Sequence, residues 1–170
     1  MIFDKNTRDH ALLYLPKNQT VQPLVRATYD QWQIDACPHH GPDMDYMNGK
    51  LHLTWFSQGE AHSGLMYAAY DIKSKQFSTT QSVDASPQAS HPQIASNGQQ
   101  LFQVWKRFNG ENTVLLSRVS VDQGQSWSQD KRLTQTAGSS DHPLLIRNKN
   151  KVFLSWLSSD EGYQLLALED

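Results

Sequence analysis

Histidines recur at a fixed spacing along the chain, each one or two residues before a proline. His40, His91 and His142 lie 51 residues apart, and the 170-residue chain has seven histidines in all. An imidazole can hydrogen-bond a ligand, hold a metal ion or exchange a proton near neutral pH. The spacing therefore predicts that equivalent positions of a repeat bring three imidazoles to one site. The alternative is that each ring only caps a strand by bonding a backbone carbonyl.

Glutamates repeat on nearly the same period. Glu60, Glu111 and Glu161 are 51 and 50 residues apart, and Arg107 stands shortly before the second of them. A guanidinium and carboxylates could hydrogen-bond a polar ligand, whereas glutamates in exposed turns often serve only as solvated charges. The candidate ligand-binding residues are accordingly His39, His40, His91, His142, Arg107, Glu60, Glu111 and Glu161.

A cluster of soft donors occupies positions 37 to 47. Cys37, His40, Met44 and Met47 combine a thiol, an imidazole and two thioethers, which are donor types that suit copper or zinc. The spacing matches no standard zinc motif, and Cys37 could equally be a small buried apolar residue. A bound copper or zinc ion is thus a second hypothesis beside ligand binding.

The elements that would carry these residues come from a repeat of about 50 residues. The segment LHLTW at 51–55 recurs as LFQVW at 101–105 and as VFLSW at 152–156, and prolines 42, 92 and 143 keep the same register. Apolar and polar residues alternate within each unit, as they do in strands. The repeated tryptophans are expected in the core between sheets.

Each repeat predicts four antiparallel strands. In the middle unit the expected strands are 93–96, 101–106, 114–119 and 131–135, with Asn97-Gly98 as a hairpin turn. Four antiparallel strands in about 50 residues are typical of a propeller blade. We therefore expect an all-β propeller segment, with a partial blade at 1–36, blades at 37–86 and 87–136, and a partial blade at 137–170.

The two end segments each predict part of a blade. Residues 10–15 and 24–29 match third and fourth strands, and 140–170 offers the first three strands. Propellers have about four to eight blades, so we expect a longer chain or a second copy to complete the ring. In a propeller, the connections between blades and the turns between second and third strands share one face, where the candidate ligand-binding residues are expected.

One turn carries a longer motif. Ser120, Asp122, Gly124, Ser126 and Trp127 fit the pattern Ser-x-Asp-x-Gly-x-Ser/Thr-Trp. The aspartate can accept hydrogen bonds from turn amides, and the glycine allows a positive φ. This motif resembles the Asp-box of sialidase-type propellers. A degenerate copy of it, with Asp71, Ser74 and Phe77, occurs in the preceding repeat. The resemblance implies a structural motif on the face away from the ligand.

A second segment is similar to the same family. Residues 32–42, WQIDACPHHGP, resemble the Trp-x-Ile-x-x-Cys-Pro-x-x-Gly-Pro segment of bacterial six-bladed sialidase-like proteins, most of them exported. On that alignment the chain corresponds to a C-terminal half. The resemblance implies a periplasmic or secreted location, although residues 1–6 lack the apolar core of a signal peptide. It also implies glycosidase activity or carbohydrate binding.

The arginines do not complete a sialidase catalytic set. Such an enzyme clamps a carboxylate with several arginines and uses a tyrosine nucleophile. Arg107 is the one arginine plainly expected in a ligand-face loop, while Arg26 and Arg132 occupy equivalent outer strands and Arg118 precedes the Asp-box. Catalytic residues therefore stay unassigned. Binding of a carbohydrate or other small ligand is the favoured function; soft-metal binding and a protein-interaction scaffold are the alternatives.

Composition excludes several classes of protein. With 15 basic and 17 acidic residues the net charge is −2, which lacks the basic footprint of a nucleic-acid binder. No apolar run approaches the roughly 18 residues of a membrane span. A single cysteine excludes an internal disulfide framework.

Overall fold

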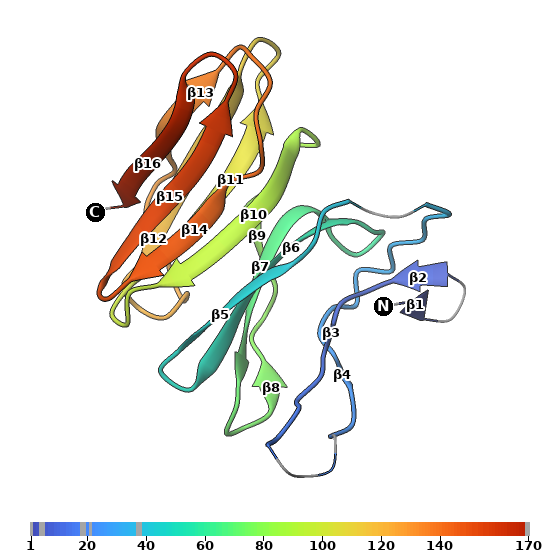
Figure 1. Ribbon diagram of the computed structural model, residues 1–170. Helices are drawn as coiled ribbons and strands as arrows, with labels where there is room; N and C mark the ends of the chain where they lie inside the picture. The colour runs from blue at the N-terminus through green and yellow to red at the C-terminus, as the bar shows by residue number, and fades with distance from the viewer. Residues whose placement is uncertain (1, 4–5, 18–19, 21, 37–38, 169–170) are drawn as a thin grey trace.

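The chain folds into antiparallel sheets that follow one another along the sequence (Figure 1). The computed structural model describes residues 2–3, 6–17, 20, 22–36 and 39–168. Strands hold 55% of the residues, and the described residues contain neither a helix nor a sheet closed into a barrel. The prediction of an all-β protein is therefore confirmed. No helix that could cross a membrane occurs in this part of the chain.

The N-terminal segment forms two short antiparallel pairs. β1 (Ile2–Phe3) pairs with β2 (Thr7–Arg8), and β3 (Ala11–Leu12) pairs with β4 (Val25–Arg26). The strands expected at 10–15 and 24–29 are thus shorter than predicted. Pro16 and Pro23 lie between them, and a proline has no backbone N–H to donate to a ladder.

Three larger sheets follow. The first sheet consists of β5 (Asp43–Met47), β6 (Lys50–Gln58), β7 (Ser63–Asp71), β8 (Gln76–Phe77) and β9 (Gln81–Asp84). The second sheet consists of β10 (Ala89–Ser96), β11 (Leu101–Phe108), β12 (Thr113–Ser120) and β13 (Lys131–Thr136). The third sheet consists of β14 (Leu144–Asn148), β15 (Lys151–Ser158) and β16 (Gly162–Leu168). Each sheet falls inside one of the predicted units 37–86, 87–136 and 137–170.

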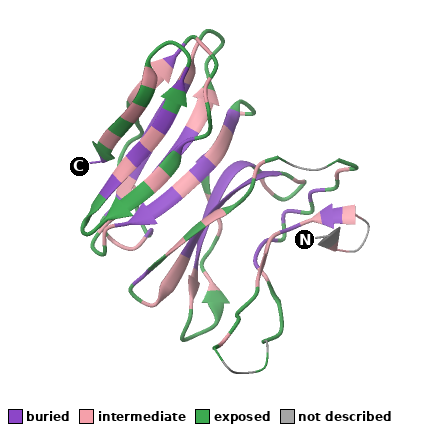
Figure 2. Ribbon diagram, in the orientation of Figure 1, coloured by how far each residue is buried: buried purple, intermediate pink, exposed green. Residues whose placement is uncertain are grey.

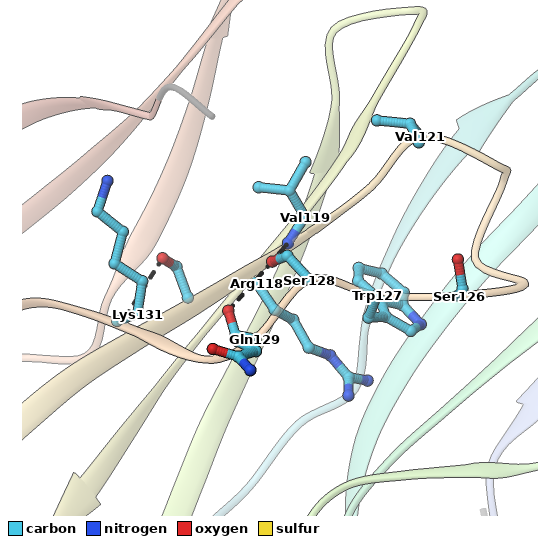
Figure 3. Close-up of a pocket in the computed structure, with 9 residues that line it drawn as sticks. Arg118, Val119, Val121, Ser126, Trp127, Ser128, Gln129 and Lys131 are labelled. Atoms are coloured by element: carbon cyan, nitrogen blue, oxygen red, sulfur yellow. Dashed lines mark hydrogen bonds between the residues drawn. The ribbon is translucent and has the colours of Figure 1, made fainter.

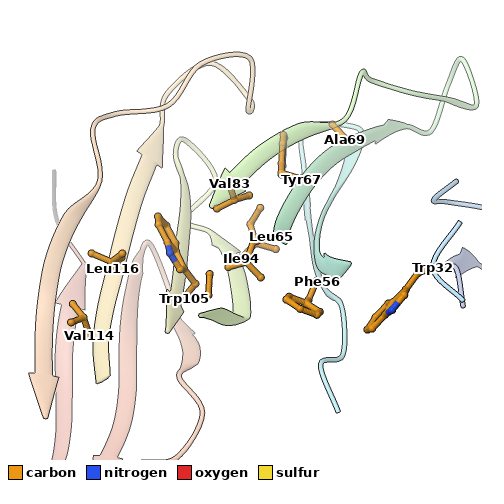
Figure 4. Close-up of a cluster of buried hydrophobic side chains, with 11 residues drawn as sticks. Trp32, Phe56, Leu65, Tyr67, Ala69, Val83, Ile94, Trp105, Val114 and Leu116 are labelled. Atoms are coloured by element: carbon orange, nitrogen blue, oxygen red, sulfur yellow. The ribbon is translucent and has the colours of Figure 1, made fainter. Parts of the chain in front are cut away.

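Apolar side chains between successive sheets form the core (Figure 4). Figure 2 shows where buried residues lie along the strands. The first and second sheets share a cluster of Phe56, Leu65, Tyr67, Ala69, Val83, Ala89, Ile94, Trp105, Val114 and Leu116, with Trp32 at one edge. The second and third sheets share Ala95, Phe102, Val104, Leu115, Val152, Leu154, Trp156 and Leu168. Because strand residues alternate between faces, the second sheet contributes one face to each cluster.

The repeated tryptophans are buried and held by hydrogen bonds. Trp105 Nε1 donates to Asp84 Oδ2 at 2.8 Å, and Trp55 Nε1 donates to Asp30 Oδ2 at 2.7 Å. Trp156 Nε1 instead donates to the backbone carbonyl of Asp141 at 3.0 Å. All three side chains are at most 1% exposed, so the expectation that they form the core is met.

The first strands of the three sheets lie side by side. Asp43 Oδ2 accepts a hydrogen bond from the Ile94 N–H at 2.8 Å, and Asp45 Oδ2 accepts one from the Ser96 N–H at 2.6 Å. Arg147 of β14 reaches Asp45 at 3.5 Å. Burial raises the pKa of Asp43. These side chains link β5 to β10 and β5 to β14. Residues 43 and 45 contact residues 94 and 96, which lie 51 positions further along the chain, so equivalent positions of the repeat are neighbours.

A buried polar contact lies between the first two sheets. His52 Nδ1 and the Tyr67 hydroxyl are 2.7 Å apart, and their rings are nearly parallel. His52 is fully buried. Burial, with a smaller effect from Lys50, lowers the pKa of His52 to about 4, and burial raises the pKa of Tyr67. The His52 ring is therefore neutral at pH 7.

The stability of the protein is expected to fall on mild acidification through His52. Between pH 6.5 and 4 the unfolded chain protonates this histidine and the native protein does not, so unfolding takes up a proton and becomes easier as the pH falls. The His52 contribution is a loss of about 2 kcal/mol between pH 7 and pH 5. Urea unfolding of wild type and His52→Gln across this range measures it. Equal slopes of stability against pH in the two proteins would contradict the assignment.

Candidate ligand-binding face

One side of the molecule gathers two kinds of loop. The Ala61 N–H donates to the Asp30 carbonyl, the Phe108 N–H to the Gln88 carbonyl and the Ser159 N–H to the Ser139 carbonyl. In each sheet, this bond starts in the turn between the second and third strands, or at the strand end beside that turn. It ends in the segment that precedes the first strand of the same sheet. We call this side the loop face; it comprises turns 59–62, 109–112 and 159–161 and segments 39–42, 85–91 and 137–143.

The three histidines in register meet on the loop face. The ring centroids of His40 and His91 are 4.7 Å apart, and those of His91 and His142 are 3.5 Å apart with the planes nearly parallel. His40 also contacts the Phe56 ring at 4.5 Å. We call His40, His91 and His142 the histidine row. The placement follows from the side-by-side first strands, because equivalent residues just before or at the start of these strands are then neighbours.

The backbone at His91 departs from the regular strand. The ladder between β10 and β11 shifts register between Ser90 and Gln93, and His91 has a φ of +51°. A left-handed conformation is uncommon for a residue other than glycine, although histidine is among the residues that adopt it more often. This bulge takes His91 out of the ladder, so its side chain is available to the histidine row.

Two imidazoles of the histidine row, those of His40 and His91, are neutral at pH 7. Burial and the neighbouring imidazoles of His142 and His40 lower the pKa of His91 to about 4. Burial, His142 and His39 lower the pKa of His40. The nearby Lys106 ammonium donates to the backbone carbonyls of Ser140 and Asp141.

A cavity of about 410 Å³ lies beside the row. Its walls combine apolar rings with hydrogen-bonding groups: Trp32, Ile34, His39, His40, Phe56, Gln58, Pro87, Gln88, Ala89 and Ser90. Trp32 and Phe56 pack edge to face at 5.6 Å. An apolar wall with a few convergent polar groups is the usual form of a small-ligand pocket.

The other predicted ligand-binding residues lie on the loop face but serve different contacts. Arg107 pairs with Asp84 at 3.2 Å, the same carboxylate that holds Trp105. Glu60, Glu111 and Glu161 are exposed. The Glu161 carboxylate accepts a hydrogen bond from Ser158 Oγ at 2.7 Å, and bonds from Thr136 and Ser158 lower its pKa. The structure therefore brings His39 and the histidine row together, and no contact found in the described residues links the glutamates to them.

The soft donors named from the sequence lie apart. Met44 is half exposed and Met47 is buried at the far end of β5 from His40. They are three positions apart in a strand, and such residues face opposite sides. Cys37 lies outside the described residues. Within the described part of the chain, no three histidine, cysteine, aspartate or glutamate side chains are grouped to hold a metal ion.

The motif at residues 120–127 that resembles an Asp-box, here called the Asp-box turn, follows the end of β12 remote from the loop face. Asp122 accepts hydrogen bonds from the Ser126 N–H and hydroxyl and from the Ser120 hydroxyl. Those from Ser126 are the main reason that the pKa of Asp122 falls to about 2. The Gly124 N–H donates to Ser120 Oγ at 2.8 Å. These bonds stay within the turn.

Trp127 connects the Asp-box turn to the first sheet. Its ring meets Tyr67 edge to face at 5.0 Å, its Nε1 donates to Gln81, and the Arg118 guanidinium lies over it at 4.5 Å. Arg118 Nε donates to Gln103, and Gln103 donates to Thr54 across the sheet interface. A second cavity, of about 470 Å³, adjoins this turn (Figure 3). The contacts of Asp122 and Trp127 are those of a structural turn.

Sequence reasoning missed part of the loop face. Phe56 and Gln58 line the cavity, and Asp30 holds both Trp55 and His62, the latter at 2.8 Å. Trp32 lies in the segment that resembles the sialidase-like family, and that resemblance is the feature of the sequence that could have identified it. Asp30 and Asp84 stand 25 and 21 residues before their tryptophans, so no constant spacing marks them.

Comparison of the chain with known protein families, curated proteins and solved structures finds no match.

Proposed function

We propose that the chain is a segment of a β-propeller whose loop face binds a carbohydrate in the cavity beside the histidine row. Support for the propeller comes from the successive antiparallel sheets and from the side chains that join their first strands 51 residues apart. The outward side of the third sheet carries exposed Leu144, Leu157, Tyr163 and Leu165, as expected where a further sheet would pack.

The observation that carries ligand binding is the composition of the 410 Å³ cavity. A sugar ring has an apolar C–H face and a rim of hydroxyl groups. Trp32 and Phe56 offer apolar wall, and His39, Gln58 and Ser90 offer donors and acceptors. The described residues that line the cavity include no carboxylate and no tyrosine, and the proposal is therefore limited to binding.

A glycan array with two lining variants tests this proposal. His39 and Gln58 are exposed, so His39→Ala and Gln58→Ala should keep the fold while removing hydrogen bonds to the sugar. We expect each to weaken saccharide binding at least fivefold. Gln129→Ala is the matched control, because Gln129 is also an exposed glutamine but lines the cavity at the Asp-box turn.

Two results would contradict the proposal. One is an array on which the folded chain binds no saccharide. The other is binding that weakens with Gln129→Ala and not with the loop-face variants, which would move the ligand to the Asp-box side.

A further inference from the structure

Two imidazole nitrogens in the histidine row have no hydrogen-bond partner among the residues that the structure describes. The Nδ1 atoms of His40 and His91 are buried, and no described residue donates to them or accepts from them. Buried polar atoms in proteins are nearly always paired, and an unpaired one commonly marks the place of a water or an ion. Two such atoms on adjacent rings therefore point to one shared partner.

The arrangement of the two rings suits a shared metal ion. Two imidazoles on one tetrahedral ion, with metal–nitrogen bonds of about 2.0–2.1 Å, have ring centroids roughly 5 Å apart. The His40 and His91 centroids are 4.7 Å apart and the planes are inclined by 59°, so nitrogens of both rings can be directed to one point. His91 and His142 differ: at 3.5 Å and 12° they are stacked, and stacked rings do not direct their lone pairs to one point.

The surroundings hold both rings in position. Phe56 packs against His40, His142 stacks on His91, and the bulge at Ser90 keeps His91 out of the ladder. Copper, nickel and zinc are the ions that imidazole ligands suit. A cavity adjoins the row at His40 and Ser90.

We propose that His40 and His91 bind one divalent transition-metal ion, Zn²⁺ or Cu²⁺, through Nδ1, with water completing the coordination. His142 is a positioning residue, which holds the His91 ring by stacking and is not a ligand. The donor set shares His40 with the cluster of Cys37, His40, Met44 and Met47 that the sequence suggested, but its second ligand is His91. It does not depend on the proposed carbohydrate.

Calorimetric titration of the metal-free chain with Zn²⁺ tests the two ligands. We expect one ion per chain, with binding at least tenfold weaker in His40→Ala and in His91→Asn. Asparagine is chosen at position 91 because it tolerates a positive φ, so the backbone should be retained, and circular dichroism checks the fold of each variant. His39→Ala is the control, since His39 is the sequence neighbour of His40 and lines the same cavity.

The same titration separates the proposal from its rivals. Binding that survives His91→Asn unchanged, or that is lost in Cys37→Ser, would overturn it. Saccharide binding and metal binding respond to different variants, because His39→Ala is expected to weaken the sugar and to leave Zn²⁺ affinity intact. Failure of one proposal is therefore distinguishable from failure of the other.

Stacking by His142 has its own readout. His142→Ala should weaken Zn²⁺ binding several-fold, and His142→Phe should restore it, because phenylalanine can stack on His91 but cannot bind a metal. The electron paramagnetic resonance spectrum of the Cu²⁺ form should show two coordinated nitrogens in wild type and in His142→Phe. Three nitrogens in wild type that become two in His142→Phe would make His142 a ligand and contradict the positioning role.

Discussion

Replacing Trp105 by alanine is expected to lower the free energy of unfolding by about 4 kcal/mol. The side chain is fully buried between the first and second sheets, so its loss leaves a large cavity that the rigid sheets cannot close. It also removes one of the two donors to Asp84 Oδ2, a buried carboxylate oxygen that then keeps only the Arg107 guanidinium. Urea unfolding followed by far-ultraviolet circular dichroism measures the loss. A decrease below about 1.5 kcal/mol would mean that the sheets do not depend on this contact.

Phenylalanine substitutions separate the hydrogen bond from the packing. Trp105→Phe removes a hydrogen bond to a carboxylate, whereas Trp156→Phe removes one to a backbone carbonyl. Hydrogen bonds to charged groups contribute more than neutral ones, so Trp105→Phe is expected to cost about 1 kcal/mol more than Trp156→Phe. Equal costs would show that the partial loss of ring volume determines both effects.

Gly124→Ala is expected to destabilise the protein by about 3 kcal/mol, the second of the two largest effects. Gly124 has a φ of +79°, and a Cβ added there would lie 1.8 Å from the Tyr67 hydroxyl oxygen. The substitution therefore combines backbone strain with a clash that pushes Tyr67 away from His52 and Trp127. Thermal and urea unfolding report the change.

Gly98→Ala is the matched control for the clash. Gly98 also has a positive φ, +94°, but a Cβ there meets nothing within 4 Å. Only backbone strain remains, so the expected cost is about 1 kcal/mol. If the two alanine variants were equally stable, the close approach of the Asp-box turn to the first sheet would contribute nothing to the free energy of unfolding.

Much of the fold could be predicted because the signals are local and repeated. The alternation of residues in LFQVW and its two copies predicts strands, and Asn97-Gly98 predicts the hairpin between β10 and β11. Equivalence between repeats is also what placed His40, His91 and His142 together. When the first strands of successive sheets lie side by side, residues 51 apart become neighbours.

The contacts that could not be predicted are those whose partners come from another sheet. Arg107 sits on the loop face as expected, but its partner is Asp84 at the outer edge of the preceding sheet, and local sequence does not specify that contact. Met44 and Met47 illustrate a different error. Their closeness in sequence suggested a shared site, although an odd separation along a strand directs side chains to opposite faces.

The carboxylates that join the first strands constrain how this sequence can evolve in length. Asp43 and Asp45 bond the backbone of residues 94 and 96, and one residue inserted into β5 or β10 would turn the later carboxylates or N–H groups to the wrong face. Insertions and deletions should therefore be tolerated in the turns 59–62, 109–112 and 159–161, which border the loop face. Natural selection could then vary the shape of the loop face by changing loop length, while the strands beneath keep a fixed number of residues.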